Sequence, residues 1–410
     1  MDPNESDESE DEGDAVAGEA EDAEEEEIDW EAIDVEQVDA DNVTHVKALI
    51  DQMENAPAHE LVWGLSRTAI YHIPFKIRRP FRALAEYFMR MLKRDEYSAN
   101  LEVQGHCWRL ITEWLRMDQN DPDRENLVAK QYLREVAIAQ DVPGLVLAEI
   151  LRQPRREQLL ELAIGTLSDI GLSALGADAL VRAGLVHPLL LLARELKPNI
   201  TAIRSLIALT NIALFPNSHA SFLANEQEGI QVAISMLGGL TSIRLDELDC
   251  ALTASFIICR VCGTDEHGPG TEYIHSNSLF LTKLKWVLLN VLRSPHHIFM
   301  GAHWDPANIL FDVSTLAMSD RNKPLLVGFI PILVSSLKQL QANVRAIRFS
   351  IRTLWQLAVD PICLEELVRL VNVSTAFTSV LGDLEMDFST DLLTLQEISA
   401  LRRISLGETM

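Results

Sequence analysis

A five-residue signature returns along the second half of the chain and constrains its fold more than any other feature. Each copy has an aliphatic residue, two variable residues, a second aliphatic residue and a small residue. The copies stand at 167–171, 209–213, 258–262, 313–317 and 354–358. The first and last steps, of 42 and 41 residues, match the period of about 40 residues of stacked helical units that bury a core only against their neighbours. The chain is therefore predicted to be a solenoid.

The residues between the first two copies describe the rest of one unit. Residues 179–193, ALVRAGLVHPLLLLA, contain a short helical pattern, a bend at Gly184 and an all-apolar helical pattern. The two longer steps contain inserts at 263–278 and 294–306, which are rich in Gly, Pro and His as exposed loops are. Runs with the alternation of strands are hard to find, so the folded part is predicted to be all-α.

This pattern resembles the armadillo repeat and the related HEAT-like units. The resemblance implies a right-handed α-solenoid, it covers residues 161–384 well, and it is weaker over 42–160, where the units are degenerate. Apolar periodicity and proline breaks in that weaker part predict helices at 58–72, 80–94, 98–117, 124–140 and 143–152. The last segment, 385–410, is predicted to hold a capping helix from Asp391 to about Ser405 and a short tail.

Negative charge is concentrated at the start of the chain. The net charge is −26, but residues 1–41 hold 21 Asp and Glu with no Lys or Arg, so the rest of the chain is close to neutral. Such a segment cannot bury enough apolar surface to offset its chain entropy, so a disordered acidic tail is expected. Within it, residues 28–38 alternate acids with Ile28, Trp30 and Ile33, which fits either folding on a partner or packing on the first helix.

The remaining composition indicates an intracellular protein. No cationic start is followed by an apolar run, and no uncharged run reaches the length of a membrane span. Five cysteines, an odd number lying mostly inside apolar helical patterns, are expected to be reduced core residues. We expect a cytoplasmic protein, with the nucleus as a second compartment.

The armadillo resemblance implies where a partner would bind. In that family the third helix of each unit lines a concave groove, and its binding residue, an Asn, lies between the two aliphatic residues of the signature. Those positions here are Asp169, Asn211, Arg260, Thr315 and Gln356, and Asn211 alone matches. The tryptophan and asparagine ladder of nuclear-import adaptors is therefore absent.

Adding the preceding turns gives the predicted groove a gradient. Acid at the first unit gives way to apolar and aromatic side chains, then to base at the last unit, because side chains four residues apart share a helix face. The gradient residues that complete the predicted groove are Ile207, Phe256, Phe311, Arg348 and Arg352. Such a groove would select an extended peptide with direction. The alternative is that the two phenylalanines are core and the charges are solvated.

Other chemistry has weaker support in the sequence. Cys259 and Cys262 have histidines nearby, but both lie inside a repeat helix, whereas a structural zinc site usually has ligands on turns. No phosphate-binding glycine loop or hydrolase motif is present, so neither a metal, a cofactor nor an enzyme activity is predicted. The basic segment PFKIRRPFR at 74–82 has interleaved aromatics, yet the near-neutral body disfavours nucleic acid.

The sequence therefore predicts an interaction scaffold or adaptor that holds a protein partner. One alternative is a nuclear transport factor or chaperone for basic cargo that uses the acidic tail, and an enzyme or enzyme regulator is a third reading. The tail could also dock on a basic patch of its own molecule. Two short motifs fit phosphorylation, Ser9 for an acid-directed kinase and Ser405 for a base-directed one, although such motifs also occur by chance.

Overall fold

The computed structural model describes most of the chain from Arg78 onward. The described ranges are 78–94, 100–116, 124–152, 154–224, 229–265, 267–299, 302–340, 342–373, 375–388 and 390–406. The predicted acidic tail at 1–41 and the predicted helix at 58–72 lie outside these ranges.

From Arg124 onward the described chain consists of six successive units, each built from three helical segments. The first two units are α6 (Arg124–Ala139), α7 (Val142–Leu151) and α8 (Glu157–Ile170), then α9 (Ala174–Arg182), α10 (Val186–Leu196) and α11 (Ile200–Ile212). The third is η3 (Pro216–Ser218) with α12 (His219–Leu223), α13 (Gly229–Met236) with η4 (Leu237–Thr241), and α14 (Leu245–Cys262). The fourth is α15 (Pro269–Ser276), α16 (Ser278–Arg293) and α17 (Pro306–Ala317). The last two are η5 (Lys323–Phe329), α18 (Ile330–Gln339) and α19 (Val344–Leu357), then α20 (Pro361–Val373), α21 (Thr375–Asp387) and α22 (Leu392–Ser405).

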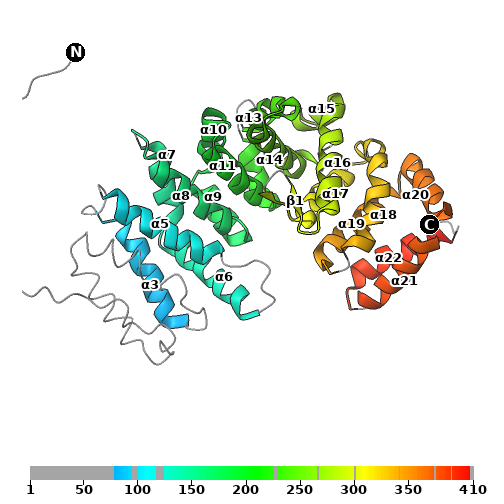
Figure 1. The fold of residues 1–410 in the computed structure, drawn as a ribbon, viewed down its shortest axis with the longest axis horizontal. Helices are drawn as coiled ribbons and strands as arrows, with labels where there is room; N and C mark the ends of the chain where they lie inside the picture. The colour runs from blue at the N-terminus through cyan, green and yellow to red at the C-terminus, as the bar shows by residue number, and fades with distance from the viewer. Residues whose placement is uncertain are drawn as a thin grey trace, which may run out of the picture.

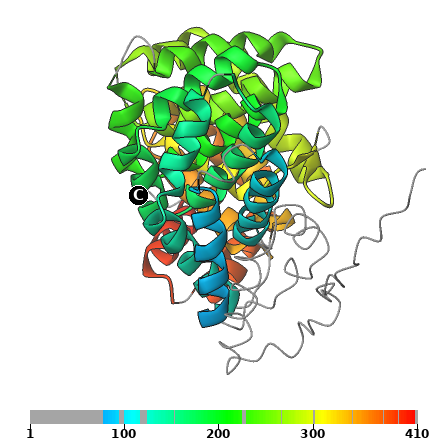
Figure 2. The ribbon, with the colours of Figure 1, turned by 90° about the vertical axis from the view of Figure 1, so that its left-hand side faces the viewer.

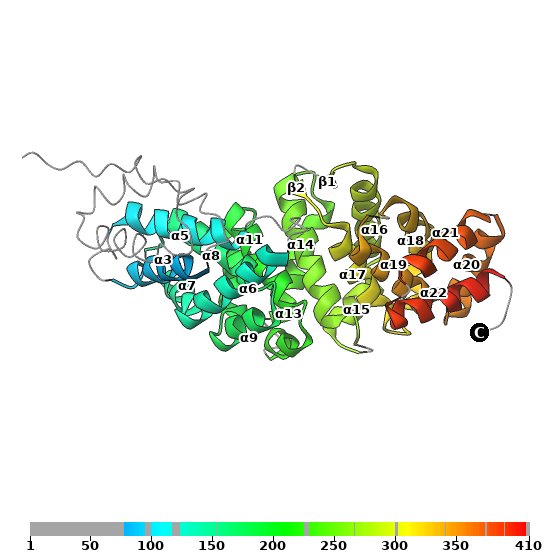
Figure 3. The same ribbon diagram turned by 90° about the horizontal axis from the view of Figure 1, so that it is seen from below.

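Two further helices, α3 (Arg78–Met91) and α5 (Leu101–Arg116), precede these units. Helix α5 packs on α8, and each third helix packs on the next, in the order α8, α11, α14, α17, α19 and α22. The units form an arch whose inner side is lined by these helices (Figures 1 and 3). Figure 2, which looks along the array from its N-terminal end, shows α3 and α5 in front of the stacked units.

Consecutive third helices run in the same direction. Arg204 of α11 bonds Glu161 of α8, and Asn211 bonds Ser168, so the paired residues keep a constant separation along both helices. Helix α14 continues the register, because Thr210 of α11 donates a hydrogen bond to the carbonyl of Thr253. Parallel stacking of equivalent helices is the geometry of a solenoid.

Short polar residues set where the helices begin. The side chains of Ser173, Asn199, Asp305 and Asn343 each accept a hydrogen bond from a backbone N–H in the first turn of the following helix. The bend between α9 and α10 is at Gly184, whose φ of +73° is unfavourable for residues with a side chain.

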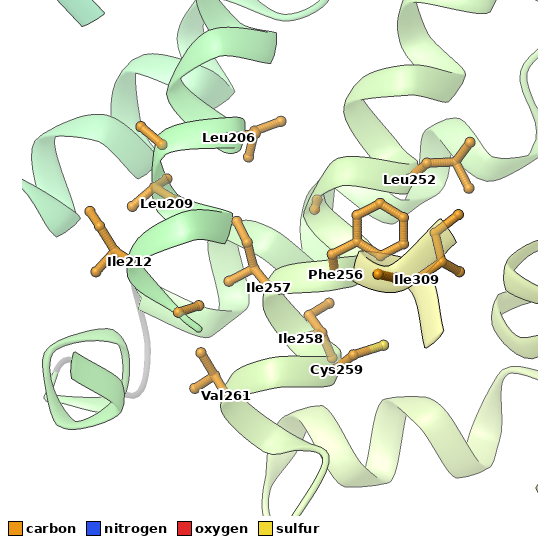
Figure 4. Close-up of a cluster of buried hydrophobic side chains, with 14 of the residues drawn as sticks. Leu206, Leu209, Ile212, Leu252, Phe256, Ile257, Ile258, Cys259, Val261 and Ile309 are labelled. Atoms are coloured by element: carbon orange, nitrogen blue, oxygen red, sulfur yellow. The ribbon is translucent and has the colours of Figure 1, made fainter. Parts of the chain in front are cut away.

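The signature residues form the core between units. All ten aliphatic positions of the five copies are buried: Leu167, Ile170, Leu209, Ile212, Ile258, Val261, Val313, Leu316, Leu354 and Leu357. Figure 4 shows this core where Leu209 and Ile212 of α11 lie close to Ile257 and Val261 of α14. The repeat register read from the sequence is therefore confirmed.

One predicted boundary and the predicted role of one helix change once the units are seen. The division at 160/161 falls inside α8, because α6 and α7 complete a regular unit with that helix rather than belonging to a degenerate N-terminal part. The expected capping helix is α22, and it begins after Asp391 as predicted. However, it packs on α19 and α21 as the third helix of a sixth unit. Leu392, the first residue of this helix, is exposed.

The two inserts are structured rather than open loops. Residues 269–276 of the first insert form α15, whose Gly270 lies so close to the Cys262 sulfur that a β-carbon would collide with it. The second insert forms a two-stranded antiparallel hairpin, β1 (Ile298–Phe299) and β2 (Ala302–His303). The prediction of loops was wrong for these segments because Gly and Pro also occur where helices start and where hairpins turn.

The fold class is thus an all-α solenoid of stacked armadillo-like units, with one small hairpin in the described part. Within the described ranges, no single helix has both the length and the apolar composition to cross a membrane. Two pairs of consecutive helical segments, each bent at a short break, have that length and composition when taken together. They are α9 with α10, and α11 with residues 216–223.

Replacing Leu209 by Ala should lower the free energy of unfolding by about 2–5 kcal/mol, because it leaves a cavity between α11 and its neighbours. Ile207→Ala in the same helix is the control, since that side chain is 40% exposed and its loss should cost under about 1 kcal/mol. Urea denaturation followed by circular dichroism measures both. Equal losses in the two variants would contradict the register.

Candidate functional site

The inner face of each third helix is the side opposite its own unit. In α19 that side can be identified from hydrogen bonds, because Ser350 bonds Ser336 of α18 behind it. Side chains near the opposite side of the helix, including Arg348, Arg352 and Trp355, therefore point to the inner surface of the arch. The same reasoning places the exposed stripe of α11 on that surface.

Helix α11 presents an aliphatic stripe to the inner face. Ile200 and Ile207 are exposed and Ile203 is partly buried, at spacings that put all three on one side of the helix. Predicted groove residue Ile207 is thus accessible. Asn211, beside the stripe, donates its amide to the carbonyl of Ser168, at 2.8 Å, so it joins α11 to α8.

The stripe is bordered by an ion pair. Arg204 of α11 lies across α8, where it pairs with the Glu161 carboxylate and donates to its backbone carbonyl. A β-carbon on Gly165 would come within 3.1 Å of the Arg204 guanidinium, so the glycine leaves room for the arginine. The acid that the sequence placed at this end of the groove is therefore neutralised locally.

Asp249 of α14 continues this surface, and sequence reasoning missed it. It lies seven residues before Phe256, on the same side of the helix, and one turn before the Thr253 carbonyl that bonds α11. Burial raises the pKa of its carboxyl to about 6. No described residue forms an ion pair or a side-chain hydrogen bond with that carboxylate. The sequence could have indicated Asp249, because residues seven apart lie on the same side of a helix and Phe256 was a predicted groove residue.

The predicted groove base Arg260 is not available to a partner. It is 2% exposed and forms a bidentate ion pair with the fully buried Asp312 of α17, with Nε 2.5 Å from the carboxylate. Its Nη1 also donates to the carbonyl of Thr210, so one side chain joins α11, α14 and α17. The prediction was wrong here because the neighbouring units cover this turn of the helix.

The aromatic centre of the predicted groove is also largely closed. Phe256 is 6% exposed and makes an edge-to-face contact with Trp304, which follows the hairpin. Phe311 is partly buried against Phe349 of α19, and Thr315 is buried with its hydroxyl bonded to the Phe311 carbonyl. These side chains join units, and Phe256 and Thr315 present almost no surface to a peptide.

The basic end of the groove carries paired arginines. Arg348 pairs with Asp391, the N-cap residue of α22, and Arg352 pairs with Glu397 of that helix, while each guanidinium keeps part of its surface exposed. Gln356 accepts a long hydrogen bond from Ser314 of α17. The predicted excess of positive charge is therefore cancelled by α22, which the sequence treated as a separate cap.

Trp355 is a second inner-face residue that sequence reasoning missed. It follows Arg348 by seven positions and Arg352 by three, so the three side chains share one side of α19, and its ring is 37% exposed. An exposed indole beside arginines is a common feature of binding surfaces.

The remaining predicted residues take internal roles or lie outside the description. Asp169 is buried near the end of α8, where its carbonyl accepts a hydrogen bond from Arg134 of α6. Ser405, the base-directed phosphosite, donates to the Arg402 carbonyl and receives a hydrogen bond from Thr378. Ser9 lies outside the described residues, as do the side chains of Arg78 and Arg79.

The cysteines behave as core residues. All five thiols are unpaired and buried, and burial raises the pKa of Cys259 and Cys262 above the ordinary value. In the part of the chain that the structure describes, no three His, Cys, Asp or Glu side chains gather in a group that could hold a metal.

Comparison with known proteins finds similarity in solved structures. No protein-family model and no curated protein sequence matches the chain. An engineered protein from a structural genomics consortium aligns over 91% of this chain and 97% of its own, at 15% identity and a TM-score of 0.47.

Two further solved structures are similar at a comparable level. A designed armadillo repeat protein aligns over 67% of this chain and 99% of its own, at 13% identity and a TM-score of 0.42. A chain from a study of a phosphorylation switch that controls the interaction between cadherin and beta-catenin covers 88% of this chain and 68% of its own, at 13% identity and a TM-score of 0.41. Likeness at this level carries no information about a partner.

Removing one member of the Arg260–Asp312 pair should destabilise the protein by about 3–5 kcal/mol, because the other charge stays buried without its partner. Asp312→Leu should be the worse variant, since Arg260 cannot lose its proton, whereas the carboxyl left by Arg260→Met can take one up. The double variant Arg260→Met with Asp312→Leu should recover most of the loss. Urea denaturation of the wild type, the two single variants and the double variant measures these changes. If the double variant loses as much stability as the two single variants added together, the Arg260–Asp312 pair does not act as a buried ion pair.

Asp249→Asn should stabilise the protein at pH 7 by about 1–3 kcal/mol. The native carboxyl, with its pKa raised to about 6, binds a proton more tightly than the unfolded one, so its contribution to stability falls as pH rises from about 4 to about 6. The variant lacks this fall, and the two proteins should converge near pH 4. Denaturation at several pH values tests this, with the exposed, ion-paired Asp246→Asn as the control that should show no such gain.

Proposed function

We propose that the chain is a protein-binding scaffold that holds an extended segment of a partner across the inner faces of α11 and α14. The segment carries an aliphatic side chain that covers the stripe of Ile200, Ile203 and Ile207, and a Lys or Arg that pairs with Asp249. This is a binding function, in which no bond of the partner is made or broken.

The carboxylate of Asp249 carries this proposal. A partly buried acid without a cation destabilises the folded protein at neutral pH, and a solenoid has no structural need for one on its inner face. A bound cation would offset the desolvation that raises the pKa of this group. Perturbed ionisable groups of this kind are enriched at functional sites.

The neighbouring stripe supports the same reading. Ile207 lies three residues before Thr210, and Asp249 four before Thr253, while Thr210 bonds the Thr253 carbonyl between these parallel helices. Ile207 and the carboxylate of Asp249 are therefore each about one helical turn from the hydrogen bond that joins Thr210 to Thr253. Trp355 and the arginines of α19 give a second contact region further along the inner face.

The compartment is part of the proposal. Five unpaired, buried thiols support a reducing environment, which fits the cytoplasm, with the nucleus as a second location.

The test starts from peptides selected by phage display against the full-length protein. The best peptide should contain an aliphatic residue near a Lys or Arg, and Asp249→Asn should weaken its binding at least tenfold while making the protein more stable. Loss of affinity with gain of stability cannot come from unfolding. Fluorescence anisotropy gives the affinity and urea denaturation gives the stability.

Matched variants locate the contact. Ile207→Glu should also weaken binding about tenfold, whereas Ile243→Glu, at a fully exposed position just before α14, should leave the affinity unchanged. Peptides that bind Asp249→Asn and Ile207→Glu as tightly as the wild type would overturn this placement.

A further inference from the structure

One edge of the fourth unit carries a basic and aromatic surface that the inner-face function does not use (Figure 3). It runs along α16, where Lys283, Trp286 and Arg293 are spaced so that they lie on one side of the helix. Residues 278–304, which include α16 and the hairpin, contain two Lys, one Arg, three His and no Asp or Glu. This is a concentration of positive charge in a chain with a net charge of −26.

The hairpin completes this surface and holds it in place. Phe299 of β1 makes an edge-to-face contact with Trp286 at 4.8 Å, and the Lys283 ammonium lies 5.0 Å from the centre of the indole ring. Trp304 donates its indole N–H to the Phe299 carbonyl and packs on Phe256 of α14. Figure 3 shows β1 and β2 beside α16 at one edge of the array.

The end of α16 fixes the hairpin as well. The amide of Ile298 donates to the Ser294 hydroxyl, and a ring nitrogen of His297 is hydrogen-bonded to the carbonyl of Val291. His297 itself has a φ of 54°, in the left-handed region that non-glycine residues rarely occupy. The aromatic surface is therefore preorganised, with Trp286 38% exposed at its centre and Ile298 exposed beside it.

The charges on this surface differ from those of the inner face. Arg345, Arg348 and Arg352 of α19 each lie against a carboxylate, whereas Lys283 and Arg293 of α16 have no ion-pair partner among the described residues. A surface of unpaired bases around an exposed indole fits a segment that combines acids with large apolar side chains.

We propose that this surface binds residues 28–38 of the same chain, IDWEAIDVEQV. This segment carries four acids and no base, and it interleaves them with Ile28, Trp30, Ile33, Val35 and Val38. Its aromatic and aliphatic side chains cover Trp286 and Phe299, while its carboxylates pair with Lys283 and Arg293. The interaction is independent of the partner site on α11 and α14.

The length of the chain permits this contact. Thirty-nine residues lie between Val38 and Arg78, and a chain of that length extends to about 130 Å. From α5 to α17 there are four steps between third helices, and at about 10 Å a step they cover about 40 Å. Covalent attachment then keeps the local concentration of the segment on the order of millimolar, so that even weak charge-driven contact is populated.

Photo-crosslinking of the full-length protein tests the proposal. With p-benzoylphenylalanine in place of Trp30, irradiation of dilute protein should produce intramolecular crosslinks, located by mass spectrometry, mainly within residues 278–304. Lys283→Glu with Arg293→Glu should reduce their yield at least fivefold, and so should about 0.5 M salt, because screening weakens contacts between exposed charges.

Two variants separate docking from damage to the fold. Asp29→Asn, Glu31→Gln, Asp34→Asn and Glu36→Gln together remove the charge from the segment and should reduce the crosslinks equally without touching the helices. Arg182→Glu with Arg244→Glu, which reverses two exposed bases elsewhere, should leave the yield unchanged.

Three results would overturn the proposal. Crosslinks that map mainly outside 278–304, or that resist the α16 reversal, would place the segment elsewhere. Crosslinked dimers in place of intramolecular products would show a second copy as the source. Without crosslinks to this surface, a single-stranded 20-nucleotide RNA that binds wild type and not Lys283→Glu with Arg293→Glu would identify a nucleic-acid surface.

Discussion

Burial of each third helix between the third helices of the neighbouring units is the constraint on which the structure depends. A helix such as α14 touches its own unit behind it, α11 on one side and α17 on the other. Nearly every side of it is therefore covered, including positions that a lone amphipathic helix would leave to solvent. Because each unit lacks enough surface to bury this helix alone, the array is stable only as a stack.

Polar side chains on such helices are used mainly to join units. Hydrogen bonds or ion pairs join Thr112 of α5 to Thr166, Asn211 to Ser168 and Arg352 to Glu397, each across one junction between stacked helices. Arg260 crosses two junctions, because it contacts both Thr210 and Asp312. A buried hydrogen bond or ion pair of this kind leaves little free charge for a ligand. The carboxylate of Asp249 is unusual because burial removes water from it, while no described residue supplies a cation or a side-chain hydrogen bond in return. For this reason it marks the candidate site.

The insert between α16 and α17 changes the array locally. Its hairpin sends Trp304 onto Phe256 and so closes the middle of the inner face, while Phe299 extends the aromatic surface of α16 on the other side. One short segment therefore reshapes two surfaces at once. A solenoid tolerates this because a unit contacts only its neighbours, so an insert at a junction disturbs little else.

The sequence by itself determined the fold class, the repeat register and the core, because aliphatic periodicity depends only on which side of a helix is buried. It also placed Ile207 on an accessible face and α22 after Asp391. Tertiary structure decided which polar residues of that face stay free. Arg260 and Asn211 occupy equivalent positions of the repeat. Arg260 is buried in an ion pair with Asp312, whereas Asn211 donates a hydrogen bond to the preceding third helix. Whether a charge meets solvent, a carboxylate or a carbonyl depends on the helix one unit away, about 40 residues distant in the chain, and local periodicity carries no information about that neighbour.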